Sequence, residues 1–244
     1  MNLSPPPSPT EKLSLKTSAI YGLGTVAFGV KDHGFNVLLL LFYNQVLGLP
    51  ASWVGMAIMI AMVFDALFDP LLGQYSDNVR TRWGRRHPFM YAAILPVAIS
   101  YLFLWMPPSL SDQGLFIWLL ISAIAVRVSV SLYEIPSTAL LAEFTDDYDE
   151  RTRLVAARFF FGAVGGVAMM MLSFGVFLKP SADQPVGHLN LAGYSSYAIA
   201  AAIVMTLAIA ISALGTQKRI LQRPAPPPPV KTTIGVMLKE MLSI

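Results

Sequence analysis

Asp65 and Asp69 stand four residues apart inside an apolar run that covers residues 51–75. Side chains at this spacing lie on one face of a helix, with Cβ atoms about 6 Å apart, so the two carboxylates repel each other. An acid within a bilayer adds an insertion cost on the order of 3 kcal/mol, which makes it a candidate functional group. We therefore expect the pair to bind a cation, either H+ or Na+, with the two aspartates as candidate Na+ ligands. The alternative is a structural ion pair with Lys31 or Arg127.

Other charged side chains also fall inside apolar segments, namely Lys31, Asp32, Arg127, Glu134 and Arg158. Together with the aspartate pair they make four acids and three bases, a balance of one negative charge. Buried ions persist when they are paired or hydrogen-bonded, so a shared cavity would leave one charge for a proton or a monovalent cation. Hard cations prefer oxygen ligands, which Ser131 and a carbonyl freed by Pro70 would supply. For Arg158, extension of the side chain to the membrane interface is the alternative.

Motifs for enzymatic chemistry are missing from the sequence. It contains no G-x-S-x-G, no H-E-x-x-H and no Walker-type glycine loop, and its three histidines are scattered. There is no cysteine, which excludes thiolate catalysis and cysteine-based metal sites. We therefore expect neither enzymatic activity nor a cofactor other than the coupling ion.

The composition places these residues in a membrane protein. Of 244 residues 55% are hydrophobic and 13% charged, with a mean hydropathy of +0.59, whereas a soluble domain has about 25% charged residues. A spanning helix needs roughly 20 apolar residues, and six segments are long enough. We expect an all-α fold with six transmembrane helices at about 18–47, 51–75, 89–106, 114–141, 154–178 and 193–214.

The basic residues predict the orientation of these spans. Thirteen Lys and Arg residues lie in segments on one side of the six spans, whereas Lys179 is the only one on the other side. Cytoplasmic loops carry such an excess, so both termini are expected in the cytoplasm and the chain is expected to be a multi-pass protein of the cell membrane, in contact with the lipid bilayer. The net charge of +3 is explained by this arrangement, and no nucleic acid partner is expected.

The segments outside the spans have a different composition. Residues 1–17 are polar and proline-rich and are expected to form a disordered cytoplasmic tail. Residues 215–233 are expected to be a proline-rich cytoplasmic linker. Residues 234–244 carry apolar side chains on one helical face, which predicts the start of an amphipathic helix. Because the chain ends inside this helix, we expect it to be a fragment.

Several motifs in order resemble a known family. Gly73-x-x-x-Asp77, followed by the basic run at 82–86, is similar to the loop between spans two and three of the major facilitator superfamily. Together with D-x-x-x-D-P at 65–70, Glu134-Ile135-Pro136, the D-x-x-E-R turn at 147–151 and Arg158-Phe159-Phe160, it resembles the glycoside-pentoside-hexuronide:cation symporters of the melibiose permease type. The resemblance covers most of residues 12–223. It implies the amino-terminal six-helix bundle of a twelve-span transporter, with a carboxy-terminal six-helix half as the missing partner.

The resemblance also implies roles for individual residues. Those implied to bind the coupling cation are Asp65, Asp69 and Ser131, and those implied to bind the solute are Lys31, Asp32, Glu134 and Arg158. Structural or gating charges are expected at Asp77, Arg82, Arg85, Arg86 and Arg127. Phe68 stands where the family pattern has an asparagine ligand, and Thr138 stands where it has a tryptophan, so the ion and the sugar are both left open.

The function implied is cation-coupled secondary transport by alternating access, with symport of a sugar or glycoside. Two alternatives remain open from the residues alone. The first is a transporter of a non-sugar solute such as a lipid or a drug. The second is a non-transporting membrane receptor or scaffold, in which the buried charges serve only to hold the helices together.

Overall fold

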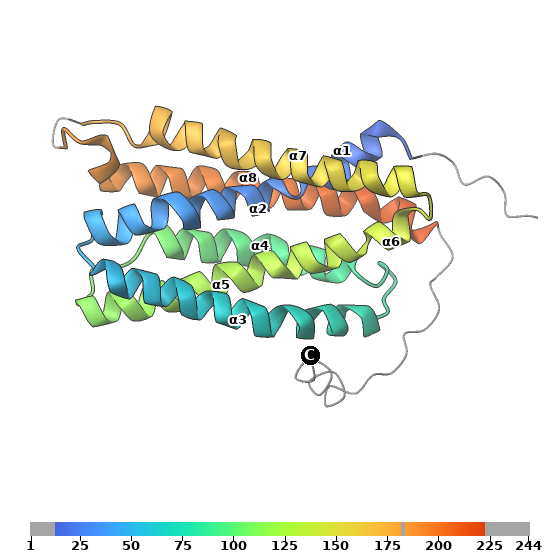
Figure 1. Ribbon diagram of the computed structural model, residues 1–244, viewed down its shortest axis with the longest axis horizontal. Coiled ribbons are helices and arrows are strands. Elements are labelled where there is room, and N and C mark those ends of the chain that lie inside the picture. Colours follow the sequence, from blue (N-terminus) through green and yellow to red (C-terminus); the bar gives the residue numbers. More distant parts are fainter. Residues whose placement is uncertain (1–12, 182–183, 223–244) are drawn as a thin grey trace, which may run out of the picture.

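The computed structural model describes residues 13–181 and 184–222, which form a long bundle of helices lying side by side (Figure 1). These residues contain no β-strand, and their only β-bridge joins Thr81 to Gly84. The elements are α1 (Leu15–Leu23), α2 (Val26–His33), the π-helical segments η1 (Gly34–Leu38) and η2 (Leu41–Val46), α3 (Ala51–Asn78), α4 (His87–Trp105), α5 (Asp112–Ala139), α6 (Leu141–Phe144), α7 (Tyr148–Leu172), the π-helical segment η3 (Ser173–Phe177), the short 3₁₀ helix η4 (Gly187–Leu189) and α8 (Leu191–Leu221).

Five helical stretches among the described residues are long and apolar enough to cross a membrane: α3, α4, α5 with α6, α7 with η3, and α8. The first expected span, residues 18–47, is not one continuous helix. It breaks between α1 and α2, where the Thr25 hydroxyl is shared between the carbonyls of Gly22 at 2.7 Å and Arg158 at 2.6 Å. Because this hydroxyl joins the break to α7, the expectation of a single uninterrupted first helix is corrected.

Several helices extend beyond the apolar segments that predicted them. Helix α7 begins at Tyr148 rather than near residue 154, because the Asp147 carboxylate accepts from the backbone N–H of Glu150 at 2.8 Å and caps the helix. Helix α8 continues to Leu221, so residues 215–221 are helical rather than part of the expected linker. Hydropathy locates the apolar centre of a span, whereas capping and backbone hydrogen bonding decide where it ends.

Residues 13–17 of the expected disordered amino-terminal tail are ordered, whereas residues 1–12 lie outside the described part of the chain. Ser14 caps α1 by accepting from the N–H of Thr17, and the Leu13 side chain is buried. The Leu13 N–H donates to Glu150 at 2.7 Å, and the Leu13 carbonyl accepts from Arg153 at 2.6 Å. Residues 13–17 are therefore ordered against α7. The expected linker from residue 223 onward and the expected amphipathic segment lie outside the described residues.

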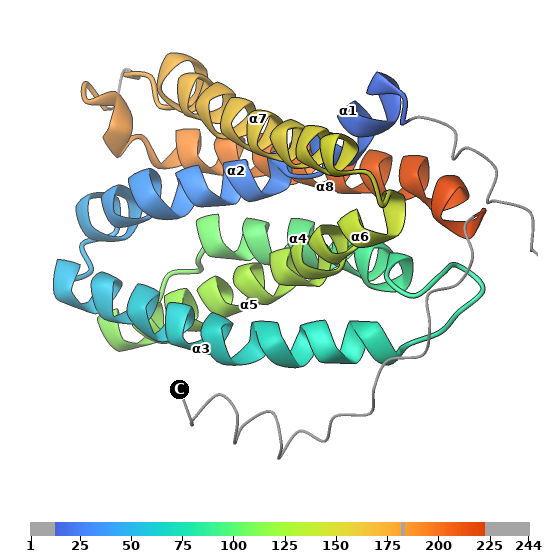
Figure 2. The same cartoon turned by 45° about the vertical axis from the view of Figure 1, so that its right-hand side comes forward.

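Helices α2 and α7 approach each other closely through glycines, and they lie next to each other in Figure 2. A Cβ atom added at Gly29 would lie 2.0 Å from the Gly162 carbonyl oxygen, and one added at Gly166 would lie 3.1 Å from the Gly29 carbonyl oxygen. Small residues permit this contact between spans in the membrane. The pairing positions Asp32 on α2 and Arg158 on α7 on either side of one space.

We predict that Gly29→Ala destabilises the bundle by about 1–3 kcal/mol, because the added methyl group clashes with a backbone atom that cannot rotate away. Gly55→Ala is the matched control, since nothing lies within 4 Å of the Cβ position at Gly55. Thermal unfolding of the chain in detergent, followed by tryptophan fluorescence, measures the difference. Equal unfolding midpoints for the two variants would show that α2 and α7 are not packed as described.

Candidate functional site

The best-connected charged pair lies between α5 and α7. Arg158 Nη2 donates to Glu134 Oε1 in a short ion pair, and the two side chains are 11% and 25% exposed respectively. The second oxygen of Glu134, Oε2, is buried and has no hydrogen-bond partner. The guanidinium is therefore held in place, while one carboxylate oxygen is left available.

Hydroxyl and aromatic groups complete the surroundings of Arg158. Its Nη1 donates to Ser137 Oγ at 2.8 Å and to the Tyr21 hydroxyl at 3.4 Å, and its Nη2 donates to Thr138 Oγ1 at 2.8 Å. The guanidinium carbon also lies 5.3 Å from the centre of the Tyr21 ring. These partners lie on α1 and α5, so the Arg158 side chain points from α7 into the bundle. The alternative in which it extends to the membrane interface is wrong.

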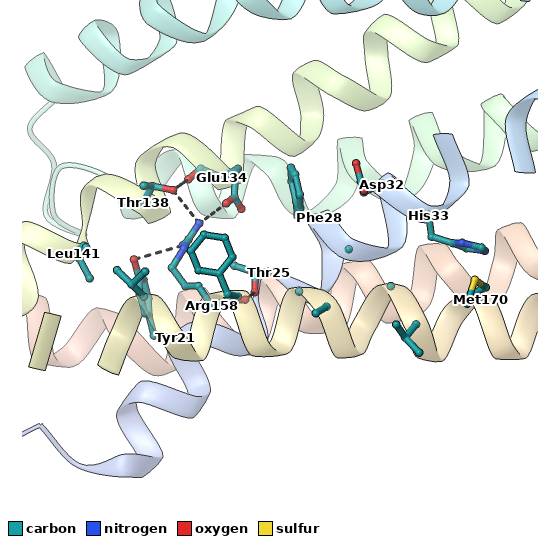
Figure 3. A pocket seen from close by; sticks show the side chains of 17 residues that line it. Tyr21, Thr25, Phe28, Asp32, His33, Glu134, Thr138, Leu141, Arg158 and Met170 are labelled. Atoms are coloured by element: carbon teal, nitrogen blue, oxygen red, sulfur yellow. Dashed lines mark hydrogen bonds and ion pairs between the residues drawn. The ribbon is translucent and has the colours of Figure 1, made fainter. Parts of the chain in front are cut away.

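A pocket of about 610 Å³ opens beside this cluster, between α2 and α7 (Figure 3). Glu134, Thr138 and Arg158 form one end, and Asp32 and His33 lie toward the other end. Much of the remaining wall is apolar or glycine, and its lining residues include Phe28, Gly29, Phe159, Gly162, Gly166, Val167 and Met170. A polar group at one end of an otherwise apolar pocket is the usual character of a small-molecule site.

The aspartate pair lies on α3, and its members differ in their contacts. Asp65 Oδ2 accepts from Arg127 Nη1 at 2.5 Å, and the guanidinium carbon lies 5.1 Å from the centre of the Phe35 ring. The other oxygen, Asp65 Oδ1, is buried without a hydrogen-bond partner, as is Asp69 Oδ1. Arg127 thus compensates one of the two acids, which is the contact that the structural alternative expected for Asp65.

Asp69 has a different environment. Ser131 lies near its carboxylate, and the nearby charges are Asp65, Lys31 and Arg127. Lys31 is only 8% exposed, and its Nζ lies 4.3 Å from the centre of the Phe28 ring. Lys31 forms no ion pair with any residue in the described part of the chain. Asp69 therefore keeps a carboxylate oxygen that no basic group occupies.

Two helices contribute residues to both groups. On α2, Lys31 is buried and interacts electrostatically with Asp65 and Arg127, whereas the adjacent Asp32 is exposed and lines the pocket. On α5, Ser131 is near Asp69, and Glu134, one turn later, holds Arg158. The seven charged residues are therefore not gathered in one cavity. Asp32, Glu134 and Arg158 form a pocket group, and Asp65, Asp69, Arg127 and Lys31 form an α3 group. Helices α2 and α5 contribute residues to both groups.

The basic loop between α3 and α4 forms a third, separate cluster. Glu143 on α6 accepts from Arg85 and from Arg86, each at 2.7 Å, and Arg86 also lies 2.8 Å from Asp77. The expected structural charges at 77, 85 and 86 are thus brought together. Arg82 is not part of the cluster, because it is exposed and lies 5.1 Å from the Trp83 ring.

The sequence did not indicate several contributors to these clusters. Tyr21 and Ser137 gave no signal, because a hydroxyl-bearing residue within an apolar span is common packing. Glu143 was visible as an acid just beyond a span, on the side where the basic loop was expected, and this complementary charge could have identified it. Within residues 13–181 and 184–222, no three His, Cys, Asp or Glu side chains lie close enough together to hold a metal ion.

Comparison with known proteins gives consistent matches. Residues 20–243 match the family model described as MFS/sugar transport protein. An uncharacterised symporter of Synechocystis sp. is 36% identical over 181 residues, the putative glycoside/cation symporter YagG of Escherichia coli is 32% identical over 178 residues, and the glucuronide carrier protein homolog of E. coli is 28% identical over 218 residues.

These alignments cover most of this chain and less than half of each relative. They include 72%, 72% and 89% of the chain, and 33%, 39% and 47% of the respective relatives. The chain therefore spans about half the length of these curated relatives or less.

We predict that Asp65 and Arg127 stabilise each other as a pair. Arg127→Gln alone should destabilise the bundle by about 3–5 kcal/mol, because it leaves a buried carboxylate uncompensated. Adding Asp65→Asn should restore much of this loss. Thermal unfolding of the two single variants and the double variant gives the coupling energy. Arg82→Gln, at an exposed position, is the control and should change little. Additive effects of the two substitutions would contradict the pairing.

Proposed function

This chain belongs to the MFS/sugar transport protein family, and within it to the glycoside-pentoside-hexuronide:cation symporters, and from that premise we propose that it forms the solute- and cation-binding half of a secondary transporter. It is a multi-pass protein of the cell membrane. The proposed activity is symport of a sugar or glycoside with H+ or Na+, by alternating access. The proposed role is transport, with no catalytic step.

The observation that carries this proposal is the division of the intramembrane charges into two adjacent groups. Glu134 and Arg158 belong to a pocket large enough for a small solute, with Asp32 on its wall. Asp65 and Asp69 lie outside that pocket, against Arg127 and Ser131. A receptor or scaffold that needed only structural ion pairs would have no reason to leave acceptor oxygens unpartnered in both groups, since each costs free energy.

The solute is proposed to bind through the residues expected for it, Asp32, Glu134 and Arg158, with Lys31 directly behind Phe28. Carboxylates make strong, charge-assisted hydrogen bonds to hydroxyl groups. Thr138 accepts from Arg158 at the polar end of the pocket, and it presents no aromatic face. Aromatic stacking of the sugar would instead use Phe28 or Phe159, which line the pocket.

The cation is proposed to bind at Asp69, with Ser131 and the free oxygen of Asp65. Arg127 already compensates one acid, so Asp69 is the group whose charge the ion neutralises. Neutralisation at Asp69 changes the electrostatic field at Lys31, which lies on α2 next to Asp32. Cation binding and solute binding are thus coupled through α2 and α5, and such coupling is reciprocal by thermodynamic necessity.

A carboxy-terminal six-helix half is proposed as the partner that completes the cavity. Only 17% of the most apolar stretch of α3, and likewise of α7, is buried within the bundle, compared with 39–44% for α4, α5 and α8. Helix α7 lines the solute pocket, so a second bundle packed against α7 would also cover that pocket. We also propose that α1, α2, η1 and η2 together form a sixth span, which places both termini of the bundle in the cytoplasm.

We predict that Asp69→Asn abolishes the dependence of solute affinity on the cation while the bundle stays folded. The substitution is isosteric and removes no ion pair of Asp69, so the unfolding midpoint should stay close to that of the native chain. Binding of p-nitrophenyl β-D-glucoside is measured with Na+ or with choline, across the pH range in which carboxylates titrate. The native chain should bind more tightly with Na+ or at lower pH, because either ion neutralises Asp69.

Asp112→Asn is the control, since Asp112 is exposed at the start of α5, away from both groups. It should retain the full cation response. Native-chain affinity that responds to neither ion would overturn the proposed coupling. Unfolding of Asp69→Asn, with Asp112→Asn unaffected, would support the structural alternative.

A further inference from the structure

We infer that the pocket between α2 and α7 selects neutral, hydroxyl-bearing solutes and rejects those that carry a carboxylate. The inference rests on the proposed function and specifies its substrate class. It follows from which hydrogen-bonding groups of the pocket are already occupied and which are free, together with the charge of its lining. The relatives matched by this chain include proteins named for a glycoside and for a glucuronide, so the distinction matters.

Among the described residues that line the pocket, Arg158 is the only Lys or Arg. A guanidinium has four N–H groups on its two Nη atoms, and it binds a carboxylate best through two parallel donors. Here all four are used within the protein, by Tyr21 and Ser137 on Nη1 and by Glu134 and Thr138 on Nη2. No pair of parallel Nη donors remains for a second carboxylate, and the Nε–H supplies only a single further donor.

The hydroxyl groups of the pocket are committed as donors as well. Tyr21 donates to the Ser137 carbonyl at 2.8 Å, and Thr138 donates to the Glu134 carbonyl at 2.8 Å. The Thr25 hydroxyl is shared between two backbone carbonyls. Each hydroxyl has one proton to donate, so none of the three can donate to a solute without losing a contact.

The acceptors, in contrast, are free. Glu134 Oε2 is buried without a partner, and Asp32 forms no hydrogen bond or ion pair with the described residues. A sugar hydroxyl can donate to the exposed carboxylate of Asp32, whereas a carboxylate on the solute has nothing to donate. The lining itself carries two carboxylates and one guanidinium, so a carboxylate on the solute meets more acidic than basic side chains on the pocket wall. Lys31, the remaining nearby cation, is buried and is not part of the lining.

His33 is the one other lining residue that can donate, since an imidazole carries at least one N–H. Its Nε2 lies 3.4 Å from the Ser173 hydroxyl, which donates to the Met169 carbonyl at 2.7 Å. His33 lies at the far end of the pocket from Arg158 (Figure 3). With Nε2 beside Ser173, His33 offers a solute at most one N–H, at the end of the pocket away from Arg158.

The test compares two ligands that differ at one carbon, p-nitrophenyl β-D-glucoside and p-nitrophenyl β-D-glucuronide. Equilibrium binding to the full chain is measured at neutral pH with Na+ present. The native chain should bind the glucuronide at least about tenfold more weakly, because like charges face each other in the pocket. Glu134→Gln should reduce this difference in affinity, since it removes one negative charge and the ion pair with Arg158. Asp112→Asn should leave the difference unchanged.

Asp32→Asn provides a second variant, because it breaks no hydrogen bond or ion pair within the described residues and should reduce the difference between the two affinities without unfolding the bundle. Glucuronide binding equal to or tighter than glucoside binding in the native chain would overturn this inference and leave the proposed transport of a solute intact. A difference in the native chain that neither variant reduces would also overturn it. Because every residue lining the pocket belongs to this chain, the chain alone is expected to bind, and binding of neither ligand would overturn the inference and the proposed sugar substrate together.

Discussion

The structure depends on one constraint, namely that an ionised side chain inside an apolar helix has to be compensated by another group. Arg158 shows how completely this can be done, since Glu134, Thr138, Ser137 and Tyr21 surround its guanidinium. Arg127 compensates the charge of Asp65 less completely, because Asp65 Oδ1 and Arg127 Nε are buried without hydrogen-bond partners. The incomplete cases are then informative, because Asp69 and the second oxygen of Glu134 lack such a partner. At these positions a bound ion or solute would supply the missing partner.

The packing of the helices serves the same arrangement. Glycines on α2 and α7 bring the two backbones together, and a pocket remains between their flanks. The break between α1 and α2 is joined to α7 through Thr25, which accommodates the turn of the chain next to Arg158. The first span therefore gives up regular helix where it meets the polar end of the pocket. Irregular backbone at membrane depth is tolerated where it is buried in protein or lines a cavity.

Much of the fold was predictable from hydropathy, but the partners of the charged residues were not. The spans corresponding to α3, α4, α5, α7 and α8 follow from long apolar segments. The division of the first span was not predictable, because it depends on a hydroxyl contact to a residue 133 positions away. The sequence also indicated which side chains were charged and inside spans. Their sorting into two groups depends on the rotation of each helix about its axis, which periodicity does not determine when a helix is apolar on all sides.

The central claim is that the α3 group and the pocket group are coupled. The most direct test measures this coupling in both directions on one preparation of the chain. Cation affinity is measured with and without the glucoside, and glucoside affinity is measured with and without the cation. The account predicts that each ligand increases the affinity of the other by the same factor, greater than one. A factor of one in both directions would contradict it.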